Sequence, residues 1–426
     1  MKSAIQNNRS VLFLSANDFK DKSIQVIRKT PEAFAAAGWN VVYIVARDYS
    51  KAGNYYYEKE INPEGIEVIR FPMPLSWFRN NIRWHFLQTL FSQLAGWLTI
   101  FRLARRARKY MKNANAKFDV IYGYEVHGVC AVAWLGFWGR LGNIKVISRF
   151  QGTWMAKYIR EKNWLKRLLN IDDVIALKSR ADLCIMTNDG TEGDFAMKKL
   201  RSRALHNLKF WINGVDEQKL SAEHFADLKN KYNPDGSKRV VLSVSRMEQW
   251  KRVDRIIDVI SYLVKELGYM DILYIGVGEG ALLKQYQQEV LTSGMEKFIV
   301  FTGGVPNSEV NKYLNLADVF ISTYDLSNVG NPLLEAIRAN KIIFTLNNGT
   351  TKEWIEHGRN GFIYNVDNHL IENMAKDMLR VCNDADIRKH ILSEIAATEH
   401  EKLWSWEQRF AAELDAVEKL FVTNEQ

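Results

Sequence analysis

Residues 240–268 read VVLSVSRMEQWKRVDRIIDVISYLVKELG. The run VVLSV at the start is compact and apolar, which is typical of a buried parallel strand. A polar loop, residues 245–251, follows it. Beyond the loop, apolar residues recur at helical spacing until Gly268 supplies a stop: Val253, Ile256, Ile257, Ile260, Val264 and Leu267. This stretch therefore predicts a strand, a ligand-facing loop and a helix of an α/β sheet.

Two cations, Arg246 and Lys251, lie on that loop, beside the expected N-terminus of the helix. Open α/β sheets bind ligands at the carboxyl ends of their strands, and a helix N-terminus favours an anion. With Glu248 as the only acid between them, these cations indicate a diphosphate site. The loop by itself is equally compatible with a surface Arg and Lys that pair with nearby acids.

Length and composition restrict the class of protein. A chain of 426 residues fits two domains of about 200 residues each. The net charge of +9 favours anionic partners, but no nucleic-acid-binding signature is present, so we expect no nucleic acid partner. The three cysteines have neither disulfide nor zinc-ligand spacing, which favours a reducing compartment. The N-terminus does not resemble a signal peptide, and no run is apolar enough to span a membrane.

Short apolar runs alternate with helical patterns along the chain. In the first half the expected strands are 11–14, 41–45, 66–71, 120–122, 146–148 and 183–186. In the second half they are 240–244, 272–275, 299–301, 319–322 and 342–345. In the first half, Thr30 and Pro31 suggest a helix start, and 233–237 is the most linker-like stretch between the halves. This alternation predicts two doubly wound, Rossmann-like α/β domains that face a central cleft.

Polar, glycine-bearing turns follow several strands of the second half. Gly276-Val277-Gly278 is a weak signal, because any tight turn uses glycine. Asn331 and Pro332 are a good N-cap and first helical residue, which places Glu335 near the end of the first turn. Its carboxylate is suited to accept hydrogen bonds from a pair of sugar hydroxyls. The plain alternative is that Glu335 only complements the helix dipole.

Several motifs in this order resemble glycosyltransferase family four (glycosyltransferase group 1), a retaining family with the GT-B fold. They are the S-R-x4-K-x2-D run from Ser245 to Asp254, the G-x-G turn at Gly276, F-x-G-G at Phe301, Ala317-Asp318-Val319, N-x-L-L-E-A around Glu335, the Asn-Gly-Thr loop at Asn348 and Gly358-Arg359-Asn360-Gly361. Upstream, the W-I-N-G-V-D run at Trp211 is similar to the family's P-N-G-V-D signature, without its proline. Downstream, Trp404-Ser405-Trp406 is similar to its final segment.

The resemblance implies an acceptor-binding domain at residues 1–215 and a nucleotide-sugar-binding domain at 216–403. The last helix, 404–426, is expected to pack back on the first domain. Arg246 and Lys251 would hold the diphosphate, with Glu335 on the ribose as the third residue of the catalytic set. The expected donor-binding residues are Gly304, Val305, Ser327, Asn328, Asn331, Gly349, Thr350 and Thr351.

The sequence departs from the family pattern at two functional positions. Ser327 stands where the family usually has an acid eight residues before the helix glutamate. Gln151 stands where a histidine is common. On the acceptor side we expect Asn17, Glu125, His127 and Gln151, although a loop histidine is as often simply hydrogen-bonded.

The resemblance implies a metal-independent hexosyltransferase with no cofactor. Its donor would be a UDP- or GDP-sugar and its acceptor a glycan or lipid-linked molecule, in bacterial polysaccharide or cell-envelope glycan synthesis. The alternative is a catalytically weakened homologue that binds nucleotide sugar or a partner protein. An apolar stripe on 84–101, followed by basic residues to Lys112, suits a cytoplasmic protein peripheral at an anionic membrane. An apolar stripe of this kind more often packs in the hydrophobic core of a domain.

Overall fold

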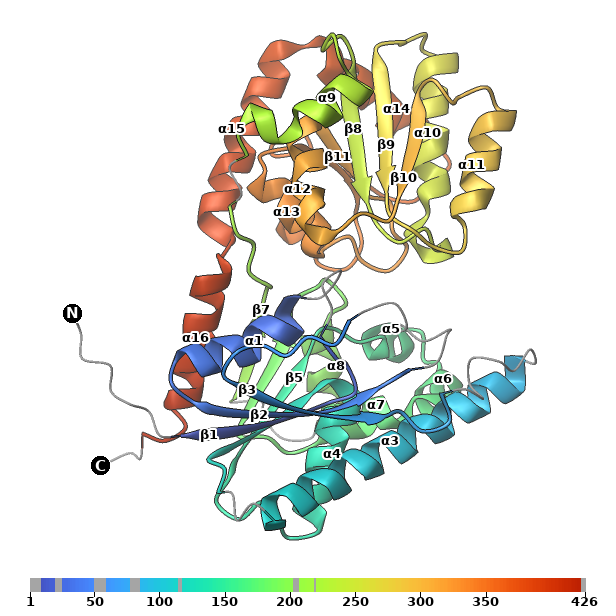
Figure 1. Ribbon diagram of the computed structural model, residues 1–426. Coiled ribbons are helices and arrows are strands. Elements are labelled where there is room, and N and C mark those ends of the chain that lie inside the picture. Colours follow the sequence, from blue (N-terminus) through green and yellow to red (C-terminus); the bar gives the residue numbers. More distant parts are fainter. Residues whose placement is uncertain are drawn as a thin grey trace, which may run out of the picture. The chain divides into compact units, whose positions relative to one another are not determined.

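The computed structural model describes residues 9–19, 25–49, 59–76, 85–113, 117–201, 207–217 and 220–422. These residues form two compact units (Figure 1). Unit 1 consists of Met1–Asn188, Glu192–Trp211 and Arg409–Gln426, and unit 2 of Asp189–Thr191 and Ile212–Gln408. Each unit is a parallel sheet covered by helices, so the expected fold class is confirmed.

The sheet of unit 1 has the strand order β3-β2-β1-β4-β5-β6-β7, and neighbouring strands are parallel throughout. Its strands are β1 (Ser10–Ser15), β2 (Asn40–Arg47), β3 (Ile66–Pro72), β4 (Val120–Tyr124), β5 (Lys145–Phe150), β6 (Leu183–Thr187) and β7 (Leu208–Trp211). The strand order reverses between β1 and β4, as in a doubly wound sheet. The central strands are apolar and buried on both faces, as a parallel sheet requires.

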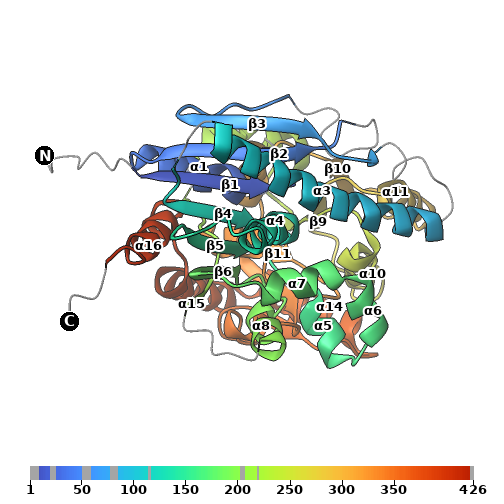
Figure 2. The ribbon, with the colours of Figure 1, turned by 90° about the horizontal axis from the view of Figure 1, so that it is seen from below.

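Helices cover this sheet on both faces. They are α1 (Gln25–Ala36), α3 (His85–Asn113), α4 (Glu125–Phe137), α5 (Met155–Arg160), α6 (Trp164–Leu169), α7 (Ile171–Lys178), α8 (Gly193–Leu200) and α16 (Trp406–Glu418). Figures 1 and 2 show α3, α4 and α7 side by side over one face of the sheet. Among the described residues, no helix has an apolar stretch long enough to cross a bilayer.

The sheet of unit 2 has the order β10-β9-β8-β11-β12-β13, again all parallel. Its strands are β8 (Arg239–Val244), β9 (Ile272–Val277), β10 (Ile299–Gly303), β11 (Val319–Ile321), β12 (Ile342–Leu346) and β13 (Phe362–Tyr364). Its helices are α9 (Ala226–Tyr232), α10 (Val253–Lys265), α11 (Leu283–Thr292), α12 (Asn307–Leu316), α13 (Asn331–Arg338), α14 (Leu370–Asn383) and α15 (Ala385–Lys402). The periodic residues of α10 are buried, as the sequence predicts.

Two expectations about local structure are wrong. Helix α1 begins at Gln25, so Thr30 is not an N-cap and Pro31 lies inside the helix. Proline lacks the N–H that would bond one turn back, and packing of the apolar face outweighs that loss. The polar stretch 233–237 lies between α9 and β8, within unit 2, and is not a linker between the units.

A buried carboxylate ties the last helix into unit 1. Glu413 of α16 is 1% exposed and accepts hydrogen bonds from Tyr122 Oη at 2.5 Å and Arg149 Nη1 at 2.9 Å. Arg409, one turn earlier, donates to the same Glu413 oxygen as Arg149, at 3.0 Å. Two fully buried guanidinium groups therefore depend on one carboxylate, which joins α16 to β4 and β5.

We expect Glu413→Gln to destabilise the protein by about 3–5 kcal/mol, because it removes the carboxylate that two buried guanidinium groups share. Urea denaturation followed by tryptophan fluorescence measures this. The matched control on the same helix is Asp415→Asn, which breaks an exposed pair with Lys419 and should change stability by at most about 0.5 kcal/mol. Equal denaturation midpoints for the two variants would contradict the role of Glu413.

Candidate functional site

The loops that follow β8, β9, β10 and β11 form the candidate site in unit 2. The chain runs from β8 to β9 and β10 on one side, then returns to place β11 on the other side of β8. The strand order thus reverses next to β8. Ligands of doubly wound sheets bind at such a reversal, outside the carboxyl ends of the strands.

Arg246 lies on the loop after β8, and its side chain is 68% exposed. Its guanidinium pairs with Glu248 at 2.8 Å, and the other Glu248 oxygen accepts from the Trp250 indole at 2.8 Å. Glu248 thus orients both neighbours. An exposed ion pair is weak, so an incoming anion can displace the carboxylate from Arg246.

Lys251, at the end of the same loop, is half-buried. Its ammonium lies 3.6 Å from the ring centroid of Tyr324 and 4.0 Å from that of Trp250. No described residue donates to or accepts from its Nζ in a hydrogen bond. Burial, with the Arg246 charge as a second cause, lowers the pKa of Lys251 to about 7. An anion placed here would raise that pKa again and restore the charge.

Backbone hydrogen bonds join the loops of β8, β9 and β10. Ser245 N donates to Val277 O at 3.0 Å, Met247 N to Glu279 O at 2.8 Å and Gly278 N to Gly303 O at 2.9 Å. A Cβ on Gly278 would lie 1.9 Å from the Ser245 carbonyl oxygen, and one on Gly280 would lie 2.4 Å from that of Met247. The glycines of this turn are therefore required for the close approach that positions Arg246.

Gly304 and Val305 follow β10, where the resemblance expects the nucleotide base. A Cβ on Gly304 would lie 2.8 Å from the Glu279 carboxylate, so the two loops touch at this point. Val305 is half-buried against the core of unit 2. The backbone between them leads into α12.

Asn328 and Ser327 lie on the loop after β11 and are both buried. The Asn328 side chain accepts from Tyr324 N at 3.0 Å and donates to Asn348 Oδ1 at 2.9 Å. The Ser327 hydroxyl donates to Asp189 O at 2.8 Å. Asn328 thus joins the loops of β11 and β12, and its expected contact with the donor stays a prediction.

Asn331 is the first residue of α13 and not its N-cap, which is Gly330. Its Oδ1 accepts a hydrogen bond from the Asn213 amide at 3.0 Å. Glu335, further along α13, lines a pocket of about 470 Å³. No described residue donates a hydrogen bond to its carboxylate, and burial raises the pKa of Glu335 to about 7. An unsatisfied carboxylate of this kind is suited to accept from ligand hydroxyls.

Gly349, Thr350 and Thr351 form the loop after β12. Gly349 has φ +52°, and a Cβ there would lie 2.0 Å from the Gly190 carbonyl oxygen. Thr351 is fully buried, and both its amide and its hydroxyl donate to the Asn348 carbonyl, at 3.1 and 2.7 Å. The Thr351 amide is therefore already hydrogen-bonded within the protein. The expected contact of this loop with the sugar or phosphate of the donor thus falls to the backbone of Gly349 and Thr350.

In unit 1, two of the four acceptor-side candidates are joined. Glu125 begins α4 with φ +57° and accepts from the Gln151 backbone N–H at 2.8 Å. The Gln151 amide donates to Tyr124 Oη at 2.5 Å and accepts from Thr187 at 3.3 Å. A non-glycine residue in the left-handed region is strained, which is common at functional sites.

The other two candidates are His127, two residues after Glu125 in α4, and Asn17. The His127 ring packs beside α3, where a Cβ on Gly96 would lie 3.3 Å from His127 Nε2. Asn17 follows β1, and its carbonyl oxygen accepts from Tyr43 Oη at 3.0 Å. All four follow carboxyl ends of strands of the same sheet, as the sequence predicts.

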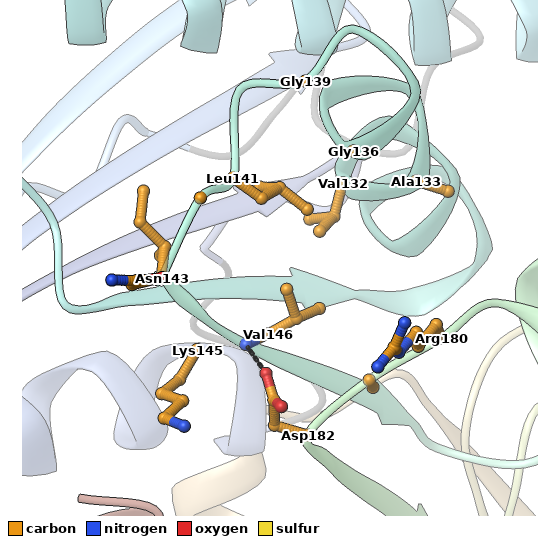
Figure 3. Close-up of a pocket in the computed structure, with 13 residues that line it drawn as sticks. Val132, Ala133, Gly136, Gly139, Leu141, Asn143, Lys145, Val146, Arg180 and Asp182 are labelled. Atoms are coloured by element: carbon orange, nitrogen blue, oxygen red, sulfur yellow. Dashed lines mark hydrogen bonds between the residues drawn. The ribbon is translucent and has the colours of Figure 1, made fainter.

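A pocket of about 910 Å³ in unit 1 lies at the opposite edge of that sheet (Figure 3). It is lined by Lys145 and Val146 at the start of β5, by Asp182 just before β6, and by the end of α4. The Asp182 carboxylate accepts a hydrogen bond from Val146 N at 2.8 Å and so links the start of β5 to the start of β6 (Figure 3). This pocket contains none of the candidate residues.

Sequence reasoning missed three side chains that shape the donor-side loops. Tyr324 and Trp250 hold the Lys251 ammonium, and Asn348 joins the loops of β11 and β12. Tyr324 and Lys251 are far apart in sequence, so no local pattern predicts that they meet. The one local feature that pointed to these contacts is Trp250, the aromatic residue directly before Lys251.

Comparison with known families now defines the class of protein. Residues 224–397, from α9 into α15, match the family described as Glycosyl transferases group 1. This segment contains every donor-side loop described above. It belongs to the group 1 glycosyltransferases, so the expected family resemblance is confirmed.

Individual relatives are more distant. The chain is 23% identical over 154 residues to alpha-monoglucosyldiacylglycerol synthase of Acholeplasma laidlawii, which covers 36% of this chain and 38% of that protein. It is 24% identical over 189 residues to a GDP-mannose-dependent alpha-(1-6)-phosphatidylinositol monomannoside mannosyltransferase of Mycobacterium tuberculosis, covering 42% and 48%. The matches span less than half the length of these curated relatives.

Solved structures share the fold over nearly the whole chain. Sucrose-phosphate synthase from Thermosynechococcus elongatus has a TM-score of 0.72 at 14% identity and covers 97% of this chain and 99% of that one. Anabaena HepE in complex with UDP has a TM-score of 0.68 at 16% identity, covering 96% and 100%. At these identities the likeness establishes the GT-B fold and no more.

We expect Gly278→Ala to destabilise unit 2 by about 2 kcal/mol or more, because it combines a positive φ with a clash against backbone. Gly294→Ala is the control: Gly294 has φ +71°, but a Cβ there meets nothing within 4 Å, so the variant should lose about 1 kcal/mol. Urea denaturation measures both. Equal losses would show that the loop of β8 does not require this glycine.

Proposed function

We propose that this chain is a retaining, metal-independent glycosyltransferase that moves a hexosyl unit from a UDP- or GDP-sugar to a glycan or lipid-linked acceptor. The observation that carries the proposal is the pair of groups in unit 2 that burial shifts toward neutrality, Lys251 and Glu335. Lys251 is suited to bind a diphosphate, and Glu335 is suited to accept hydrogen bonds from ribose hydroxyls. Both lie in the segment that belongs to the group 1 family.

Catalysis in this proposal is positioning together with stabilisation of the departing diphosphate. Arg246 and Lys251 would neutralise the negative charge that grows on the leaving group as the glycosidic bond breaks. Glu335 would hold the ribose and so fix the sugar relative to the two cations. Gly304 and Val305 would pass by the base, and the Gly349–Thr350 backbone would meet the sugar or phosphate.

The acceptor side of the proposal rests on two supports. Glu125 and Gln151 lie together at the carboxyl edge of the unit 1 sheet, where a hydroxyl can be bound. Two relatives are named for lipid acceptors, which favours a lipid-linked acceptor over a free sugar. We further propose that the protein is cytoplasmic and peripheral at an anionic inner membrane face, in cell-envelope or polysaccharide synthesis. No nucleic acid or cofactor takes part in this proposal.

A catalytically weakened homologue is the second candidate. It is motivated by Ser327, whose hydroxyl is engaged with the Asp189 carbonyl, and by Gln151, whose amide is engaged with Tyr124. Neither residue can act as an acid or base. Turnover of a bound nucleotide sugar separates the two candidates, and the donor is found by which nucleotide sugar raises the melting temperature most.

We expect Arg246→Ala and Lys251→Met each to lower the transfer rate on the order of a hundredfold, since each removes about 2–4 kcal/mol of charge stabilisation. Methionine keeps the apolar stem of Lys251 on its aromatic rings, so stability should hold. Lys376→Ala, which removes an exposed lysine of α14, is the control for loss of charge. Near-normal turnover in both site variants would remove the diphosphate assignment.

We expect donor affinity to be highest near pH 7. Above that pH the free protein loses the Lys251 proton that a diphosphate needs. Below that pH the free Glu335 carboxylate becomes protonated, which weakens the hydrogen bonds that it accepts from ribose hydroxyls. Each limb should fall by up to about tenfold per pH unit. Calorimetric titration with a nucleotide sugar, whose diphosphate has no terminal phosphate to titrate in this range, measures the profile.

Two variants separate the limbs of that profile. Lys251→Arg stays charged at high pH and should flatten the alkaline limb. Glu335→Gln cannot ionise and should flatten the acid limb. A wild-type affinity that is constant from about pH 6 to pH 9 would show that neither group contacts the donor.

A further inference from the structure

Helix α6 has its apolar side chains on the outside. The helix reads Trp164-Leu165-Lys166-Arg167-Leu168-Leu169 and has no buried residue. Trp164 is 65% exposed, Leu168 56% and Leu165 52%, and Leu169 is also exposed. Few soluble surfaces leave adjacent large apolar residues uncovered in this way.

The orientation of α6 is the inverse of an ordinary surface helix. At about 100° per residue, Trp164, Leu165, Leu168 and Leu169 share one face and Lys166 and Arg167 the other. Arg167 is half-buried, and its Nε is buried without a hydrogen-bond partner. A soluble helix gains by turning its apolar face inward. Here the protein instead buries part of an arginine and exposes the tryptophan.

Neighbouring elements extend this exposed region. Trp154, just before α5, is 42% exposed, and Ile171 and Ile175 of α7 are also exposed. Helix α6 is adjacent to both α5 and α7 in the fold (Figure 2). We call the seven residues the α6–α7 surface: Trp154, Trp164, Leu165, Leu168, Leu169, Ile171 and Ile175.

The cations near the α6–α7 surface differ in whether they form ion pairs. Arg160 and Lys157 of α5 pair with Glu192 and Glu161. In contrast, Lys162, Lys166 and Arg167 have no acidic partner among the described residues. Two acids, Asp172 and Asp173, lie in the first turn of α7, and burial raises the pKa of Asp173 to about 7. The exposed tryptophan and leucine side chains are therefore accompanied by more cations than ionised acids.

We propose that the α6–α7 surface inserts into the head-group region of a bilayer that contains anionic lipid. Apolar side chains would enter the acyl boundary while Lys162 and Lys166 contact lipid phosphates. A second copy of this chain fits less well, because paired copies would bring the same cations together. This inference rests on the membrane part of the proposed function and names the surface responsible.

The test is flotation of the full chain with vesicles of phosphatidylcholine, alone or mixed with phosphatidylglycerol, at low and high salt. Wild type should float only with phosphatidylglycerol, and less at high salt. Leu165→Ser/Leu168→Ser should bind these vesicles about tenfold more weakly or worse. Because both side chains are exposed, its melting temperature should stay unchanged. Lys162→Gln/Lys166→Gln should lose the preference for phosphatidylglycerol.

The matched control is Met270→Ser/Leu291→Ser, which removes two apolar side chains of unit 2 with exposures of 56% and 60%. It should bind vesicles like wild type. If the α6 variant also binds like wild type, the inference is wrong and the membrane proposal stands. If wild type binds no vesicles, both are wrong. A wild-type dimer that the α6 variant converts to monomer would also overturn the inference. Nucleotide-sugar binding should be equal in all variants, which separates these outcomes from failure of the donor site.

Discussion

The close contact between the loops of β8 and β9 is the constraint on which the rest of the donor side depends. Arg246 is on an exposed loop with a weak ion pair, so its position comes from backbone and not from side-chain contacts. The bonds from Ser245 and Met247 to the β9 loop supply that backbone order. They require glycine at 278 and 280, since any Cβ there would overlap a carbonyl. A short glycine turn thus fixes the backbone of Arg246, and the exposed ion pair with Glu248 adds only a weak constraint on its side chain.

Sequence predicted the alternation of strands and helices, the family, and the loops at which cations and polar residues gather. These follow from local periodicity and from motif order. Sequence did not predict which polar residues are used internally. Asn328 and Thr351 are polar and lie on glycine-bearing loops, and the structure adds that both are hydrogen-bonded to Asn348. Their contact with the donor stays a prediction. Pro31 misled for a related reason: it is a good helix start by itself, but the buried face of α1 extends past it.

Burial has a different meaning in the two units. In unit 1, Glu413 shares a dry interior with Arg149 and Arg409, and hydrogen bonds satisfy its charge in place. Such a cluster favours this position of α16, because breaking a buried ion pair is strongly destabilising. In unit 2, Lys251 and Glu335 are half-buried with no hydrogen-bond partner for their charged groups among the described residues, and the pKa of each is shifted toward the neutral form.

That difference separates a structural charge from a binding charge. A buried ion pair that is complete without a ligand gains nothing from one, whereas a desolvated lysine or glutamate is stabilised by any group that supplies the missing partner. The aromatic rings around Lys251 reinforce this, because they tolerate the ammonium without neutralising it. A nucleotide sugar carries both a diphosphate and vicinal hydroxyls, which is why the proposed function assigns Lys251 to the diphosphate and Glu335 to the ribose.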